Sequence, residues 1–184
     1  MKTFDNLKSN FPVNWTTILV GWEGLGMISP WPDKWETFPP LLTFEEVCEF
    51  CYDRIAKPDD MKKQRLILNV LEFENKPVER ALVRYLIKPL SDLEHGDTIF
   101  ELRKWRVIML GEVLEKLKND TVYDLVALSE FWQSFGFQSD SPMEFQGVGN
   151  NIRPEDYYTD ENMKQSVITN REWLQREMEN IKQT

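Results

Sequence analysis

Apolar side chains recur at intervals of three and four residues through most of this chain, and that spacing constrains the fold more than any other feature. The longest stripe lies between Thr98 and Asn119 and consists of Leu102, Trp105 or Arg106, Met109, Leu110, Val113, Leu114 and Leu117. A stripe of this kind gives a helix one apolar face, which other helices must cover. The sequence therefore predicts helices packed on helices.

Two further helices carry capping signals at their starts. Asn14 can accept a hydrogen bond from a free amide of a first turn, and Thr43 with Glu46 fits a capping box. Glycine favours the end of a helix, so the first of these helices ends at Gly24 and Gly26. Its inward face is Trp15, Ile18, Leu19 and Trp22. The inward face predicted for the second is Phe44, Val47, Cys48, Cys51, Tyr52 and Ile55.

The remaining segments follow the same pattern with less contrast. Residues 60–73 fit a helix or a buried strand, because the run Leu66-Ile67-Leu68-Asn69-Val70-Leu71 suits either. Residues 76–88 predict a helix with an inward face of Val78, Ala81, Leu82, Tyr85 and Leu86. Another helix starts near Thr121, with Val122, Leu125, Val126, Ser129 and Trp132 following it. A last helix over 155–181 turns Met163, Val167, Leu174, Met178 and Ile181 inward.

The fold expected from these segments is all-α, either a multi-helix bundle or a short array of antiparallel helix pairs. We expect residues 1–184 to form a single domain with loops at 30–42 and 137–153. The apolar runs are too short to span a bilayer, and the N-terminus has no signal-peptide stretch. Two cysteines supply no disulfide framework. These features predict a soluble, cytoplasmic protein.

The chain has a net charge of −9, with two acidic ends around a nearly neutral middle. An acidic surface repels phosphate backbones, so we expect no nucleic-acid ligand, and we expect no membrane partner. The same surface would suit a basic protein partner. Solubility alone is an equally good explanation of the charge. The oligomeric state is left open.

The residue types that support catalysis or metal binding are sparse. Cys48 and Cys51 have the spacing of a redox or zinc pair, but both fall on the apolar face of a helix, where packing explains them better. His95 is the only histidine and fits a polar turn at a helix end. Gly21, Gly24 and Gly26 lack the Lys-Ser/Thr of a phosphate loop. The sequence predicts no catalytic residue, no metal ligand and no cofactor.

One enzymatic alternative remains open. Asp59, Glu74 and Lys76 match the spaced acid, acid-x-lysine pattern of a class of metal-dependent nucleases. In that chemistry two carboxylates hold a divalent metal and the lysine steadies the attacking water or the phosphate. The site requires Glu74 and Lys76 on a strand, so a helix over 60–73 would argue against it.

Two acidic or aromatic features are candidates for binding. Glu45, Glu49 and Asp53 form a stripe at i, i+4 and i+8, with Glu46 beside it. A solvated helix face is the alternative explanation of this stripe. The second candidate is a proline-rich loop that holds Trp31, Asp33, Trp35 and Glu36. Tryptophans in such a loop either fold back onto the core or anchor a partner.

The N-terminal stretch resembles a family of small uncharacterised bacterial proteins. Its motif runs W-x-x-I-L-x-G…G-x-I-S, from Trp15 through Gly21 to Ser29, and the segment from Thr43 to Cys51 resembles the family's capped acidic helix. The chain departs from the family's pattern by inserting Pro30 to Leu42 between the two. Proteins of this family often occur in toxin–immunity neighbourhoods, so the resemblance implies an immunity role. It implies no catalytic residues.

The leading hypothesis is therefore a cytoplasmic, non-enzymatic immunity-type protein that neutralises a cognate, basic protein toxin through acidic surfaces. The alternatives are the nuclease described above and a non-catalytic helical scaffold.

Overall fold

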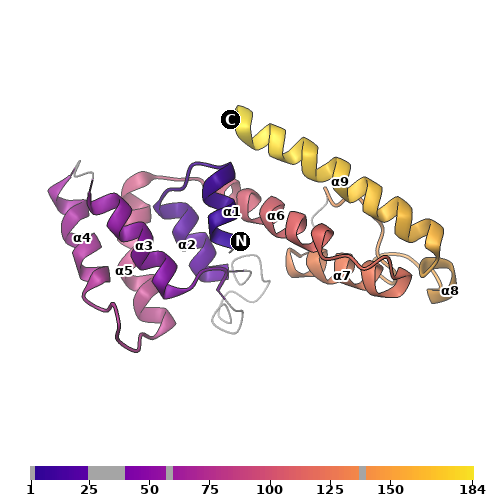
Figure 1. The fold of residues 1–184 in the computed structure, drawn as a ribbon, viewed down its shortest axis with the longest axis horizontal. Coiled ribbons are helices and arrows are strands. Elements are labelled where there is room, and N and C mark those ends of the chain that lie inside the picture. Colours follow the sequence, from indigo (N-terminus) through magenta and orange to yellow (C-terminus); the bar gives the residue numbers. More distant parts are fainter. Residues whose placement is uncertain (1–2, 25–39, 57–59, 137–139) are drawn as a thin grey trace. The chain divides into compact units, whose positions relative to one another are not determined.

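A computed structural model describes residues 3–24, 40–56, 60–136 and 140–184. These residues form nine helices and no strand, so the all-α prediction is confirmed for them (Figure 1). The helices are α1 Thr3–Asn10, α2 Trp15–Glu23, α3 Phe44–Ile55, α4 Met61–Leu71, α5 Arg80–Glu94, α6 Thr98–Glu115, α7 Thr121–Ser134, α8 Pro154–Tyr157 and α9 Asp160–Gln183. Within the described ranges, no helix combines the length and the hydropathy needed to cross a lipid bilayer.

The chain divides into two compact units, residues 1–105 and residues 106–184. The boundary falls inside α6. Whether the two units behave as the single domain predicted above stays a prediction, and each unit is described by itself.

Helix α2 is the centre of the first unit, because all nine of its residues are buried. The predicted N-cap is confirmed: Asn14 accepts from the Thr17 amide, and the Thr17 side chain accepts from the Asn14 amide in return. Gly24 closes the helix at a φ of 61°, a value that glycine adopts without strain. The predicted inward face of Trp15, Ile18, Leu19 and Trp22 is therefore only part of the buried surface of α2.

Gly21 allows α2 to lie close to α6. A Cβ atom at this position would overlap the ring of Trp105, whose indole nitrogen donates to the Thr17 carbonyl at 3.0 Å. Leu41 donates its amide to the Gly21 carbonyl at 2.7 Å, and Leu42 beside it is buried. The described end of the 30–42 segment thus packs onto α2.

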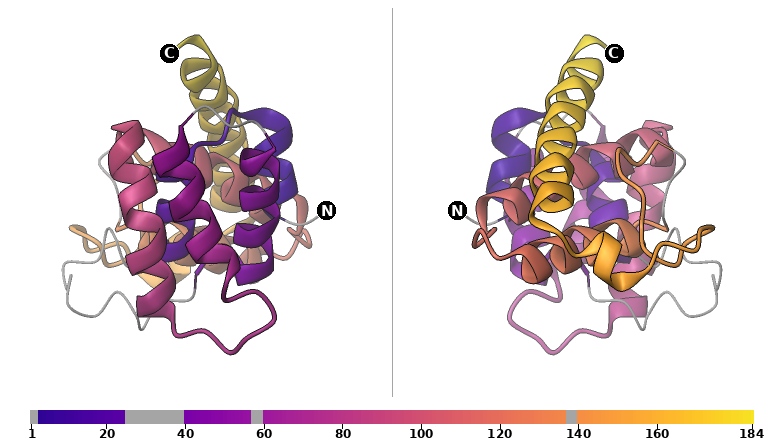
Figure 2. Two further views of the ribbon diagram at one scale, coloured as in Figure 1. Left: turned by 90° about the vertical axis from the view of Figure 1, so that its left-hand side faces the viewer. Right: turned by 90° about the vertical axis from the view of Figure 1, so that its right-hand side faces the viewer.

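Helices α3, α4 and α5 also belong to the first unit, and Figure 2 (left) shows them facing the viewer. Contacts join α3 to α4, α4 to α5 and α5 to α2. The ambiguity over residues 60–73 is resolved as a helix, which begins at the N-cap Asp60. The capping box of Thr43 and Glu46 at the start of α3 is confirmed.

The prediction for α5 was wrong in its bounds and in its inward face. The helix begins at Arg80 and continues through Pro89, and its buried residues are Val83, Ile87, Leu90 and Ser91. The predicted core residue Tyr85 is 75% exposed. The buried face is displaced by about one residue from the predicted one, so Ala81 and Tyr85 are exposed while Val78, Leu82 and Leu86 are half-buried.

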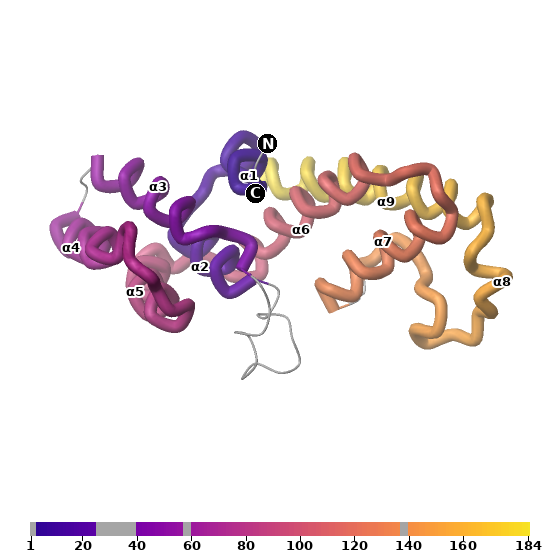
Figure 3. The backbone as a smooth tube through the Cα atoms, turned by 60° about the horizontal axis from the view of Figure 1, so that its bottom comes forward, coloured from indigo at the N-terminus to yellow at the C-terminus, as the bar shows by residue number. Residues whose placement is uncertain are grey.

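The second unit contains α7, α8 and α9, which Figure 3 follows through the connecting segment 140–153. The described part of the predicted loop 137–153 is irregular, as expected. The predicted start near Thr121 is confirmed, and the N-cap is Asp120, which accepts from the Tyr123 amide. The single helix expected over 155–181 was wrong, because Thr159 caps a new helix there.

Charged and aromatic side chains share the core of the second unit. Arg106 is 7% exposed and makes a bidentate ion pair with Asp140, with donor–acceptor distances of 3.1 and 2.8 Å. Its guanidinium lies 4.8 Å from the ring centre of Trp173 and 5.8 Å from that of Trp132. These contacts tie the segment that begins at Asp140 to α6.

Candidate functional site

The acidic stripe lies on α3 as predicted, and three of its four members are exposed. Glu45, Glu49 and Asp53 face solvent. Glu46 is only 6% exposed, because its carboxylate accepts the Thr43 amide at 2.8 Å in the capping box. Glu46 therefore stabilises the start of α3, and the accessible stripe consists of the other three carboxylates.

A groove of about 470 Å³ lies beside this stripe, and we call it the α3 groove. One wall is α3, which contributes Phe44, Glu45, Cys48, Glu49 and Tyr52. The other wall is the turn after α4, residues 74–77. The groove lies within the first unit and combines carboxylates with two aromatic rings.

A hydrogen bond joins the two walls of the α3 groove. The Tyr52 hydroxyl donates to a carboxylate oxygen of Glu74. This bond raises the pKa of Tyr52 above its usual value, because the carboxylate stabilises the protonated phenol. Tyr52 was predicted in the core and is instead 49% exposed, so that prediction was wrong. Its hydroxyl reaches Glu74 on the opposite wall.

The two cysteines behave as packing residues. Cys48 and Cys51 are free thiols with exposed fractions of 3% and 0%. Burial raises the pKa of Cys48 to about 11, with Glu74 and Glu45 adding to the effect, and burial raises the pKa of Cys51 further. A thiol with a raised pKa is a poor nucleophile and a poor metal ligand at neutral pH.

The nuclease alternative requires Glu74 and Lys76 on a strand, and the structure places them elsewhere. Glu74 and Lys76 lie in a turn after helix α4, and the described residues contain no strand to carry them. Asp59 lies outside the described residues. In the part of the chain that is described, no three His, Cys, Asp or Glu side chains gather closely enough to hold a metal ion.

The aromatic loop candidate belongs to a part of the chain that the structure does not describe. Trp31, Asp33, Trp35 and Glu36 all lie outside the described residues. The prediction that His95 lies at a helix end is confirmed. This residue ends α5 in the left-handed conformation, with a φ of 52°.

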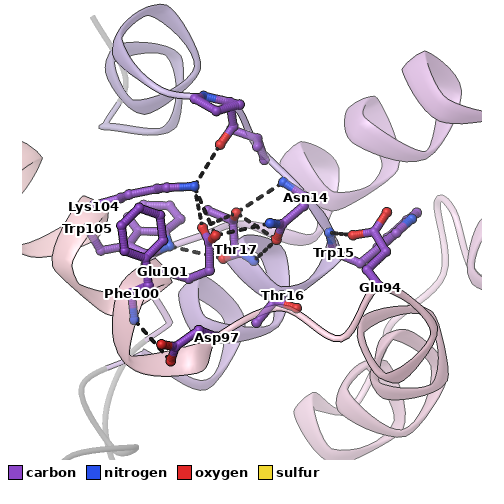
Figure 4. Close-up of polar contacts among 12 residues, drawn as sticks. Asn14, Trp15, Thr16, Thr17, Glu94, Asp97, Phe100, Glu101, Lys104 and Trp105 are labelled. Atoms are coloured by element: carbon purple, nitrogen blue, oxygen red, sulfur yellow. Dashed lines mark hydrogen bonds and ion pairs between the residues drawn. The ribbon is translucent and has the colours of Figure 1, made fainter. Parts of the chain in front are cut away.

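A second polar cluster in the first unit lies at the start of α2 and is buried (Figure 4). Lys104 and Glu101 form an ion pair at 2.9 Å with side chains only 4% exposed. Glu101 also accepts from Asn14 at 3.0 Å and from the Thr17 hydroxyl at 2.5 Å, and Lys104 donates to the Pro12 carbonyl at 3.0 Å. We call these residues the α2 network. Each charge in it has a partner of opposite sign.

Sequence reasoning missed both the α2 network and the second wall of the α3 groove. Glu101 and Lys104 share a helix face with Trp105 and Ile108, at i, i+3, i+4 and i+7, so an opposite-charge pair on an apolar face was the available signal. No sequence signal placed Glu74 opposite Glu49. Their proximity depends on how α3 packs against α4.

Comparison with known proteins places the chain within a bacterial family of unassigned activity. The family described as "Uncharacterized protein conserved in bacteria (DUF2247)" matches residues 4–178. No curated protein and no solved structure has significant similarity to the chain. The family match covers both compact units and both walls of the α3 groove.

Proposed function

The chain belongs to this family of uncharacterised bacterial proteins, and from that premise we propose that it is a non-enzymatic immunity-type protein that binds a cognate protein toxin and blocks it. The toxin is expected to present a basic surface. The observation that carries the proposal is the exposed acidic face of α3 beside the α3 groove.

The electrostatics of α3 support this proposal. Glu45, Glu49 and Asp53 are exposed along one line of the helix. The basic residue of α3, Arg54, is directed elsewhere: it donates to the Val13 carbonyl and packs over the ring of Phe50. A line of exposed carboxylates accelerates encounter with a basic protein and disfavours acidic ones.

The net charge supports the same partner. At −9, the whole chain attracts cationic proteins over a Debye length of roughly 8 Å at physiological ionic strength. An interface built on these charges would form quickly and weaken as salt is added. We propose that binding takes place in the cytoplasm, where free thiols such as Cys48 and Cys51 persist.

Co-purification tests the proposal. The chain is expressed with the product of the adjacent gene, and the expected result is a stable complex whose affinity falls as salt is raised. Expression of the chain should also restore growth to cells that produce that toxin. Failure to retain a partner at micromolar concentration, together with failure to restore growth, would refute the immunity role.

A further inference from the structure

We propose that the α3 groove binds an arginine side chain of the basic partner. That the arginine comes from a protein toxin rests on the proposed function. The choice of arginine as the bound side chain rests on the residues that line the groove.

The charges that line the groove select a cation. Glu45 and Glu49 come from α3 and Glu74 from the facing turn, whereas Lys76 is the one basic residue among the lining residues. The carboxylates are thus on both walls, so a cation between them would be attracted from two sides. An anionic ligand would meet repulsion from the same three groups.

The size and the aromatic lining of the groove select an organic cation over a metal ion. Its volume of about 470 Å³ is in the range, roughly 300–1,000 Å³, that holds small organic ligands. Among the described residues, the carboxylates are not gathered as a metal ion needs them. Phe44 and Tyr52 are among the lining residues, and aromatic side chains attract cations through their ring faces.

The contact between Tyr52 and Glu74 favours arginine over lysine. One oxygen of the Glu74 carboxylate accepts the Tyr52 hydroxyl, which fixes the orientation of the carboxylate. Arginine presents several N–H donors in one plane, and that plane can also stack on an aromatic ring. Lysine carries a compact charge without a planar set of donors. It therefore makes weaker use of the oriented Glu74 carboxylate and does not stack on an aromatic ring in the way that arginine does.

Lys76 provides an internal check on this assignment. Its ammonium lies 5.6 Å from the ring centre of Phe73, and the residue is exposed at the edge of the groove. A resident cation at this position opposes the entry of a second one. Removing it should therefore strengthen arginine binding, which a purely structural role for the groove would not produce.

The test is an NMR titration of the isotopically labelled full chain at low ionic strength. The probe is N-acetyl-arginine methylamide, with N-acetyl-lysine methylamide as the matched comparison. We expect saturable shifts of amides in residues 44–52 and 74–77, with the lysine derivative about threefold weaker. Glu49→Gln should weaken arginine binding about fivefold and Lys76→Met should strengthen it about twofold. Glu172→Gln, an exposed carboxylate on α9, should leave it unchanged.

Three results would overturn the proposal: no saturable shift, equal binding of both derivatives, or arginine affinity that Glu49→Gln and Lys76→Met leave unchanged. The outcome is separable from that of the immunity role. Arginine binding without a retained toxin would refute the immunity role alone. A retained toxin without arginine binding would refute the groove assignment alone.

Discussion

The first unit brings carboxylates and ammonium groups together in two places that differ in their exposure to water. In the α2 network, Glu101 and Lys104 are paired at 2.9 Å and their side chains are 4% exposed. In the α3 groove, Glu49 and Lys76 are exposed, and carboxylates outnumber ammonium groups. Both places lie next to a helix whose start is fixed by a capping box.

The difference separates charges that hold the fold together from charges that are available to a partner. A buried charge loses its hydration and is tolerated only with a hydrogen-bonded counterpart. Exposed carboxylates keep their hydration, so an excess of one sign can persist on the surface. Function is therefore expected where the charges are unbalanced and accessible, which is the α3 groove.

The largest predicted effect comes from breaking the α2 network. Lys104→Met removes the cation and leaves the buried Glu101 carboxylate without its counter-charge, so the free energy of unfolding should fall by about 3–5 kcal/mol. Urea denaturation measures the change. The matched control is Lys88→Met, which breaks the exposed pair with Asp92 and should cost less than about 1 kcal/mol. Equal losses in the two variants would contradict the structural role of the network.

The close approach of α2 to α6 gives the next largest effect. Gly21→Ala places a methyl group against the Trp105 ring and should cost about 1–3 kcal/mol in unfolding free energy. Gly111→Ala is the control, because the nearest atom to its added Cβ is at 3.8 Å. That variant should be neutral or stabilising, since alanine favours a helix by up to about 1 kcal/mol. An increase in the unfolding free energy of Gly21→Ala would contradict the close packing of α2 against Trp105.

The cysteines beneath the α3 groove predict a dependence on pH. Burial raises the pKa of Cys48 from its ordinary value of 9.0 to about 11, and burial also raises the pKa of Cys51. Between these values the unfolded chain loses thiol protons that the folded chain retains. The free energy of unfolding should therefore fall as pH rises from about 9 to 11. A Cys48→Ala/Cys51→Ala variant should lose less stability over this window, and an identical decline in both proteins would contradict the shift.

Thiol reactivity checks the same point at lower pH. In the folded chain at pH 8, both thiols should react slowly with Ellman's reagent because they are buried and protonated. In denaturant both should react promptly. Rapid reaction of the folded chain would contradict the burial of the two thiols.

The smallest effect on stability is expected in the α3 groove itself. Glu49→Gln removes an exposed charge, so the free energy of unfolding should change by no more than about 0.5 kcal/mol. Its effect should appear in binding alone. A large loss of stability would mean that Glu49 stabilises the fold, as Glu101 does in the α2 network. The two places would then not differ in the role of their charges.

Local signals in the sequence were sufficient for the helices and their caps. Asn14 and Thr43 were identified because a cap depends on residues three positions apart. The inward face of α5 was wrong because several neighbouring apolar residues left its register ambiguous, and packing against α2 and α4 decided it. Tyr52 was assigned to the core for a similar reason. Its spacing fits the apolar face of α3, but the buried side chain at this point of the helix is its neighbour Cys51.

The candidate site was only half predictable. Glu45, Glu49 and Asp53 could be read from the spacing of a single helix. Glu74 is 25 residues from Glu49 in the sequence, and only the packing of α3 on α4 brings it to the opposite wall. Binding geometry that depends on two elements requires the tertiary structure, whereas a charged helix face does not.

The most direct measurement of the central claim is the affinity of the co-purified partner for a charge-reversed α3. Glu45→Lys/Glu49→Lys should raise the dissociation constant at least about tenfold, because like charges would then face each other. Its unfolding free energy should stay close to that of the unmodified chain. The control Glu172→Lys should leave the affinity unchanged. An unchanged dissociation constant for the α3 variant would contradict the claim that this acidic face binds the partner.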